Sequence, residues 1–215
     1  MKKKLINLGN ITSQDFINDP KRLGITLSRY KFVGKMFEGF NSVLEVGSGD
    51  GFKSLSLKNS FKSLTLTDIQ PKKKILFDTN YKVNSSVFGS GSFNFKNIDF
   101  ILHDFVKNSL KQKFDGIFGL DVLEHIKKKD EKKFILNLKK SLKPNGSLII
   151  GMPSLQSQKY ASKLAKKEHV NCKTKAELRK FLKKYFKNVY MFSMNDEVLH
   201  TGFDDLSHYI IGLAN

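Results

Sequence analysis

The chain has 215 residues, of which 40% are hydrophobic and 12% aromatic, and its formal net charge is +18. A chain of this length can bury one substantial core. Its single cysteine, Cys172, excludes an intrachain disulfide and a zinc site built from several cysteines.

The positive charge comes almost entirely from lysine, because arginine occurs only at Arg22, Arg29 and Arg179. Arginine is the side chain that proteins favour for reading phosphates and guanine edges. The charge therefore fits either a nucleic-acid partner or a lysine-rich solvated surface, and we favour the second. The N-terminal run MKKKLINLGN is broken by polar residues, and no later stretch reaches membrane-spanning length. We expect a cytoplasmic protein that does not insert into membranes.

Residues 1–41 are predicted to be a helical lead-in to the main domain. Leu23, Leu27, Tyr30, Val33 and Phe37 recur at steps of three and four, as the apolar face of a helix does. We expect this helix to lead into the first strand, and residues 42–215 to form the principal domain.

Short apolar runs then alternate with helical segments. The predicted strands are 42–46, 63–69, 97–105, 114–123 and 147–152, and the predicted helices between them include 51–60 and 130–142. Largely apolar strands separated by helices indicate a parallel sheet that is covered on both faces.

The C-terminal segment breaks this alternation. A helix is predicted from about Thr174 to Tyr185, because Thr174 and Glu177 have the spacing of a capping box. Strands at 188–194 and 208–214 follow with no helix between them, which indicates an antiparallel pair at the sheet edge. The polar stretch 80–97 fits a loop or a weak helix with a linker, and its pattern does not distinguish them.

The first predicted strand ends in three alternate glycines, Gly47, Gly49 and Gly51, within VLEVGSGDG. The dinucleotide fingerprint is G-x-G-x-x-G, so the third glycine here comes one residue early. Asp68 ends the second predicted strand and Asp104 the third, at the edge where such sheets bind a ribose and a base. The alternative is that each acid only caps the helix after it. Together the loop and the two acids indicate a nucleotide-like ligand.

VLEVGSGDG, LTLTDI, HDF and FDGIFGLDVLEHI, followed by SLKPNGSLIIGMPS, resemble the successive motifs of class I S-adenosylmethionine-dependent methyltransferases. The resemblance covers residues 42–154 and is closest to the group whose fourth motif reads DVLEH. It implies an α/β, Rossmann-like, doubly wound fold with a seven-stranded sheet, mostly parallel with an antiparallel C-terminal hairpin. It also implies S-adenosylmethionine as cofactor and S-adenosylhomocysteine as product.

By the same resemblance, Glu45 and the glycine turn would face the methionine end of the cofactor. Asp68 would bind the ribose hydroxyls, Asp104 the adenine amine, and Leu120 with Asp121 would lie beneath the sulfonium. In the preceding helix Arg29 or Tyr30 would meet the cofactor's carboxylate, unless Tyr30 packs inward. The complete expected set is Arg29, Tyr30, Glu45, Gly47, Ser48, Gly49, Gly51, Asp68, Ile69, His103, Asp104, Phe105, Leu120 and Asp121.

Methyl transfer to a hydroxyl or a protonated amine also requires removal of a proton. His125 follows the fourth strand and is the best-placed base, although it would equally suit a helix cap. His169 and His200 lie in two polar segments, 154–175 and 194–208, that we expect to shape the acceptor pocket. A metal bound by these histidines and Glu124 is conceivable, but their spacing matches no metal motif, so we predict none.

We therefore expect an S-adenosylmethionine-dependent methyltransferase that acts on an oxygen of a small-molecule or sugar acceptor, as in surface-polysaccharide or metabolite biosynthesis. N-methylation of an amino sugar would suit the same residues. The alternative acceptor is RNA or DNA, which the charge favours, although the fourth strand ends in GLDVLEH and not in an NPPY-type motif. A third hypothesis is a catalytically silent protein of this fold that binds a partner, against which the intact glycine loop argues.

Overall fold

The structure is a computed structural model that describes residues 7–82 and 97–215. Its α-helices are α1 (Asn10–Asn18), α2 (Lys21–Met36), α3 (Pro71–Phe77), α4 (Glu131–Ser141), α5 (Lys163–Glu168) and α6 (Lys175–Lys183). Its strands are β1 (Ser42–Val46), β2 (Ser63–Asp68), β3 (Ile98–Leu102), β4 (Phe114–Leu120), β5 (Leu142–Pro153), β6 (Val189–Asn195), β7 (Val198–His200) and β8 (Tyr209–Ala214). Within the described ranges, no helix is long and apolar enough to cross a membrane.

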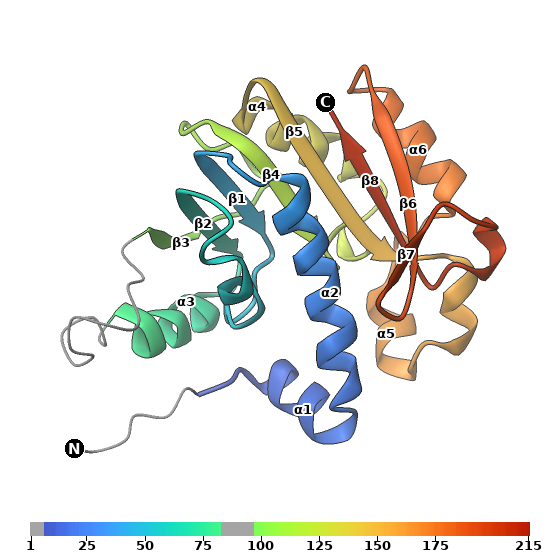
Figure 1. The fold of residues 1–215 in the computed structure, drawn as a ribbon, viewed down its shortest axis with the longest axis horizontal. Helices are drawn as coiled ribbons and strands as arrows, with labels where there is room; N and C mark the ends of the chain where they lie inside the picture. Colours follow the sequence, from blue (N-terminus) through green and yellow to red (C-terminus); the bar gives the residue numbers. More distant parts are fainter. Residues whose placement is uncertain (1–6, 83–96) are drawn as a thin grey trace.

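The strands form one sheet in the order β3-β2-β1-β4-β5-β8-β6-β7 (Figure 1). The first five in this order are parallel, and β8 is antiparallel to both β5 and β6. This confirms the Rossmann-like α/β fold and the antiparallel pair predicted at the C-terminus.

The predicted count of seven strands was wrong, because the sheet has eight. The additional strand, β7, pairs antiparallel with β6 through Asn195 and Val198. Asp196 between them has a φ of 51°, a left-handed conformation that aspartate tolerates better than most residues. The chain therefore folds back within the polar segment 194–208, for which no strand of its own was predicted.

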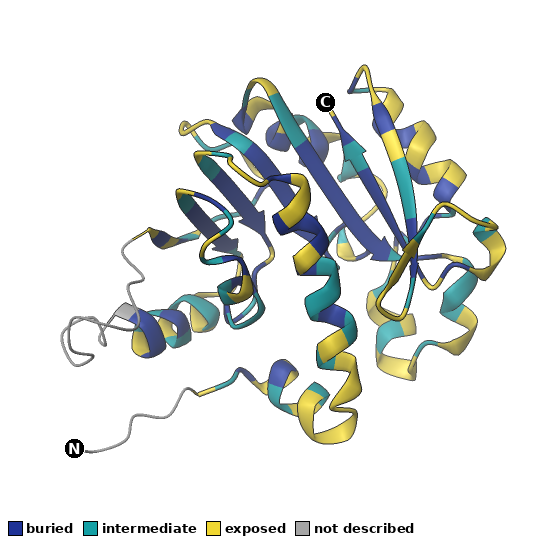
Figure 2. Ribbon diagram, in the orientation of Figure 1, coloured by how far each residue is buried: buried dark blue, intermediate teal, exposed yellow. Residues whose placement is uncertain are grey.

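Both faces of the sheet are buried, and neighbouring residues of the central strands point to opposite faces. In β1, Val43 packs in a cluster with residues of α2 and α3, whereas Leu44 packs in a cluster with residues of α4 and α6. In β4, Phe118 and Ile117 divide between the same two clusters. Figure 2 shows that the middle of the sheet is buried. This arrangement leaves the ends of the strands as the accessible part of the sheet.

The N-terminal region forms two helices where the periodicity predicted one lead-in helix. Pro20, which has no backbone N–H, follows the end of α1 and directly precedes α2. Helix α2 packs on the sheet, with the Tyr30 and Phe118 rings edge to face at 6.1 Å between centroids. The Gly9 N–H, just before α1, donates to Asp50 Oδ2 at 2.7 Å and so ties the N-terminal segment to the glycine loop.

Several local predictions differ from the structure, including the end of β4, predicted at 123, and the start of β5, predicted at 147. The helix expected over 51–60 is only a 3₁₀ segment, η1 (Lys53–Leu57). There the Ser56 hydroxyl donates to the Lys53 carbonyl at 2.7 Å, the kind of local bond that competes with an α-helix. Strand β3 ends at Leu102, so Asp104 lies in the loop beyond it. Of the stretch 80–97, residues 83–96 lie outside the described part of the chain.

Candidate active site

A cleft of about 680 Å³ opens beyond the carboxyl ends of β1 and β4. Helices α1 and α2 form one wall, and the segment 157–169, which includes α5, forms another (Figure 1). Open parallel sheets bind their ligands in this position. Of the predicted site residues, those in its lining are Arg29, Tyr30, Gly47, Ser48, Gly49, Leu120, Asp121, His125 and His169.

The three glycines of the loop after β1 all have left-handed backbone, with φ between 60° and 76°. A Cβ on Gly47 would lie 2.5 Å from Val122 Cγ2, and one on Gly51 would lie 2.9 Å from the Phe77 ring. A Cβ on Gly49 would have no atom within 4 Å, and Gly49 lines the cleft. Gly47 and Gly51 therefore allow close packing of the loop, whereas Gly49 leaves a stretch of backbone open to a ligand.

Asp68 and Asp104 both accept hydrogen bonds from nearby backbone. Asp68 Oδ2 accepts from the Gly49 N–H at 3.1 Å and Oδ1 from the Gln70 N–H at 2.8 Å, so this carboxylate braces the glycine loop. Asp104 Oδ1 accepts from the Val106 N–H at 2.9 Å. These bonds do not cap helices, because the start of α3 has no side-chain cap and no described helix directly follows Asp104. Each carboxylate oxygen retains a lone pair for a further donor.

Asp68, Asp104 and the predicted residues beside them all lie outside the cleft lining. His103 Nε2 is 3.0 Å from the Asn108 carbonyl oxygen, and its ring packs against Phe105, which is buried in the core. Ile69 is 65% exposed. The structure thus gives His103 and Phe105 packing contacts of their own.

Glu45 is a buried carboxyl group at the end of β1. The Tyr30 hydroxyl donates to its Oε1 at 2.7 Å, which is the inward packing of Tyr30 considered as the alternative. Burial raises the pKa of Glu45 to about 7, and the Ser54 and Tyr30 hydroxyls offset part of that effect. Glu45 is therefore a core residue that does not line the cleft, although the sequence motifs implied that it faces the cofactor.

Asp121, directly after β4, has a φ of 58°, which turns the chain into the short η3 segment (Leu123–His125). Its backbone N–H donates to the Gly151 carbonyl at 2.9 Å, and its Oδ2 lies 3.4 Å from Arg29 Nη1. The Arg29 guanidinium also stacks on the Tyr209 ring at 3.7 Å. Strained backbone of this kind is common at functional sites, and here it directs the next residues toward the cleft.

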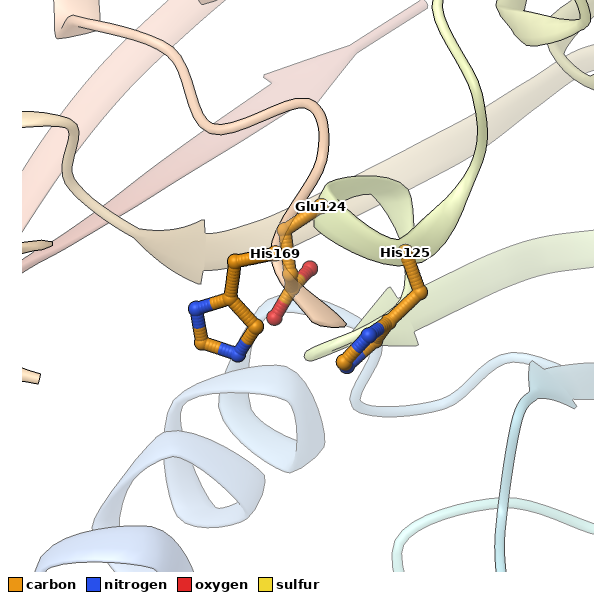
Figure 3. A group of neighbouring side chains, drawn as sticks. All are labelled: Glu124, His125 and His169. Atoms are coloured by element: carbon orange, nitrogen blue, oxygen red, sulfur yellow. The ribbon is translucent and has the colours of Figure 1, made fainter. Parts of the chain in front are cut away.

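The structure brings two of the three predicted histidines together. The rings of His125 and His169 are 5.0 Å apart (Figure 3). His125 Nδ1 is 3.2 Å from the Glu168 carbonyl oxygen, and His169 Nδ1 is 2.8 Å from Gln158 Oε1. Because these oxygens only accept, each Nδ1 carries the proton, and in the neutral ring each Nε2 offers a lone pair. Burial and the neighbouring His125 lower the pKa of His169, which favours its neutral form.

His200 lies elsewhere, on β7, where its Nδ1 accepts a hydrogen bond from the Gly202 N–H at 3.1 Å. It does not line the cleft. No role in the cleft was predicted for Gln158, which orients His169, or for Tyr209, which stacks on Arg29. Their contacts depend on the packing of distant segments, and no motif in the sequence marks them.

Glu124, next to His125, is completely buried, and neither of its carboxylate oxygens has a hydrogen-bond partner among the described residues. Figure 3 shows its carboxylate between the two imidazoles. Burial and the nearby charge of Asp121 raise its pKa well above the usual range. A buried carboxyl group without a partner is unusual, and its raised pKa favours the neutral form while no cation is present.

A family model described as a methyltransferase domain matches residues 20–189. The chain belongs to this methyltransferase family. No curated protein sequence matches it.

Solved structures with the same fold include other methyltransferases, at sequence identities that show the fold alone. An S-adenosylmethionine-dependent methyltransferase from Clostridium acetobutylicum has a TM-score of 0.68 at 14% identity, covering 95% of this chain and 96% of that one. The methyltransferase domain of bacterial CtHen1 has a TM-score of 0.66 at 19% identity, with 91% and 97% covered. The N-methyltransferase NodS from Bradyrhizobium japonicum, in complex with S-adenosylhomocysteine, has a TM-score of 0.57 at 16% identity, covering 93% of this chain and 86% of that one.

The protein is thus a methyltransferase, and the sequence motifs imply S-adenosylmethionine as its cofactor. The residues present fit that group, because the half-buried Gly49, which lines the cleft, and the spare acceptor capacity of Asp68 lie at the same edge of the sheet. When bound, the cofactor supplies a methyl group on a positively charged sulfur.

Proposed function

We propose that this methyltransferase transfers a methyl group to a hydroxyl oxygen of a small-molecule or sugar acceptor. The observation that carries the proposal is the pair of imidazoles, His125 and His169, in the cleft that also contains the glycine loop. The acceptor oxygen forms a bond to the methyl carbon, and the electrons of the carbon–sulfur bond pass to sulfur. The hydroxyl proton passes to an imidazole Nε2, which Nδ1 hydrogen bonding leaves as an acceptor.

For the cofactor we propose the arrangement that the sequence motifs imply. The open backbone at Gly49 supports contact with the amino-acid part, and Asp68, which is bonded to that loop, is suited to the ribose hydroxyls. Asp104 is suited to the adenine amine through its free oxygen capacity. Arg29 and Asp121, paired at 3.4 Å, line the same cleft as the two histidines.

The charge of the cleft supports a small acceptor over a nucleic acid. Its lining contains five acids, Asp15, Asp50, Asp121, Glu124 and Glu168, and four bases, Arg22, Arg29, Lys53 and Lys73. A site that tracks a phosphate backbone needs a clear excess of bases. The chain's +18 charge is therefore not concentrated where the chemistry occurs. An amino-sugar nitrogen would suit the same cleft.

The test is an acceptor screen with S-adenosylmethionine labelled in the methyl group. Sugar nucleotides and hydroxylated metabolites are offered in parallel with RNA and DNA, and labelled product is identified by mass spectrometry. We expect an O-methylated small molecule. Methylation of nucleic acid with no small-molecule product would overturn the proposal.

With the acceptor known, His125→Gln and His169→Gln test the role of the imidazoles. We expect kcat to fall by roughly a hundredfold or more, the usual size of a lost proton-transfer group, while affinity for S-adenosylhomocysteine stays within twofold. Equal losses of turnover and cofactor affinity would instead show a structural role for these histidines.

A further inference from the structure

We propose that Glu124, His125 and His169 bind a divalent transition-metal cation in the cleft. One ligand atom from each residue lies within 4.8 Å of the other two. Figure 3 shows the carboxylate between the two rings, with Glu124 and His125 on η3 and His169 on the facing segment. This spacing is close enough for modest side-chain movement to place all three around one ion.

Both imidazoles are already held in the form that binds metal. A metal-binding histidine typically donates its other ring N–H to a carbonyl or carboxylate, which fixes the tautomer and the ring orientation. His125 Nδ1 faces the Glu168 carbonyl, and His169 Nδ1 faces Gln158 Oε1. The Gln158 amide is itself oriented, because its Nε2 donates to the Ser154 carbonyl at 3.2 Å. Two free Nε2 lone pairs therefore remain for an ion.

Glu124 provides the second, independent observation. Its side chain is fully buried, and both oxygens lack a hydrogen-bond partner among the described residues. A carboxylate in this position needs a compensating cation or several donors. The nearby cation, Arg29, is paired with Asp121. A metal between Glu124 and the two imidazoles would satisfy the carboxylate directly.

The surrounding contacts hold the three residues together. The Asn171 N–H donates to the Glu124 carbonyl at 3.0 Å, which fastens the segment carrying His169 to η3. The Asn171 and Lys173 side chains both bond Glu131 Oε2, at 3.0 and 2.7 Å. These hydrogen bonds therefore connect η3, the start of α4 and the segment before α6, and they hold the cluster in place.

Two imidazoles with one carboxylate suit Mn²⁺, Fe²⁺, Co²⁺ or Zn²⁺ better than Mg²⁺ or Ca²⁺, which prefer oxygen ligands throughout. Three protein ligands leave coordination positions open toward the cleft. We infer that an acceptor oxygen occupies one of them, an inference that rests on the proposed function. With the ion bound, both Nε2 atoms are occupied as ligands, so the hydroxyl proton passes to water and not to an imidazole as in the metal-free step proposed above.

The test uses the full chain, free of any affinity tag and stripped with a chelator. Binding of Mn²⁺, Co²⁺ and Zn²⁺ is followed by calorimetry, and the visible absorption of Co²⁺ reports its ligand set. We expect one saturable site in the wild type, with affinity reduced roughly tenfold or more in both Glu124→Gln and His169→Ala. His200→Ala is the matched control, since it removes a histidine outside the cluster and should leave the affinity unchanged.

Thermal unfolding and S-adenosylhomocysteine titration of each variant separate this proposal from the proposed function. Reduced metal affinity in variants that fold and bind S-adenosylhomocysteine normally supports the metal site. The absence of saturable binding by the wild type below about 1 mM, or equal affinity in all four proteins, would overturn it. Neither result would bear on whether the cleft methylates a small molecule.

Discussion

At the scale of single residues, Glu45 is a carboxyl group whose protonation is linked to folding. Burial raises its pKa from 4.5 to about 7, so the folded protein holds this proton more tightly than the unfolded chain does. The associated stability is fully present below pH 4.5 and is lost as the pH rises through about 7. A shift of this size corresponds to roughly 3 kcal/mol.

Glu45→Gln removes the titration while keeping an oxygen that accepts from the Tyr30 hydroxyl. We expect the variant to gain stability relative to the wild type as the pH rises from 5 to 8, by up to roughly 3 kcal/mol. Urea unfolding of both proteins without cofactor, at several pH values in that range, measures the difference. A constant difference across the range would show that Glu45 does not titrate there.

At the scale of secondary-structure elements, the caps of α5 and α6 have the same chemistry but different consequences. Thr174 and Glu177 form the predicted capping box at the start of α6, which buries Leu178, Phe181 and Leu182. Ser162 caps α5, which has no buried residue. The cap of α6 therefore supports a helix that is part of the core, and the cap of α5 supports one that is not.

Thr174→Ala is expected to lower the free energy of unfolding by about 1 kcal/mol, the usual cost of a lost helix cap. Ser162→Ala serves as the control. It should change the free energy of unfolding by a few tenths of a kcal/mol at most, because α5 can open without exposing the core. Denaturant unfolding of both variants gives the comparison. Equal effects would mean that α5 unfolds together with the rest of the domain.

Features of the elements that depend on local sequence were predictable. The strand before the glycine loop, the glycine turn and the capping box at Thr174 are each encoded by neighbouring residues, and the structure has them in the predicted places. Strand β7 was missed because its pairing depends on a left-handed residue, Asp196, within a polar segment. Asn195 and Asp196 are residue types that favour turns, and they were the feature of the sequence that could have predicted this one.

The cluster of Glu124, His125 and His169 was harder to predict from the sequence. His200 looked equivalent to His169, since both are histidines in polar C-terminal segments, and only the packing of the chain separates them. The Asn171 contact with the Glu124 carbonyl brings His169 to η3, and a residue spacing cannot reveal such a contact. Nor could composition indicate that Glu124 would be buried without a partner.

At the scale of the whole molecule, the excess positive charge and the cleft are separate features. The chain carries +18, while the cleft lining has one more acid than base if histidines are counted as neutral. The two helices before the sheet contribute to one wall, so the cleft is assembled from both ends of the chain. We infer that this one cleft binds the cofactor at the glycine loop and the acceptor at the histidines.

The most direct test is calorimetric titration of S-adenosylhomocysteine into the wild type, Gly49→Val and Gly39→Val. Both glycines have left-handed backbone, and a Cβ on either meets no atom within 4 Å, but only Gly49 lines the cleft. The substitutions thus carry similar backbone strain and differ in what they block. We predict micromolar binding by the wild type and by Gly39→Val, and loss of binding by Gly49→Val. Unchanged affinity in folded Gly49→Val would place the cofactor elsewhere and contradict binding at the glycine loop.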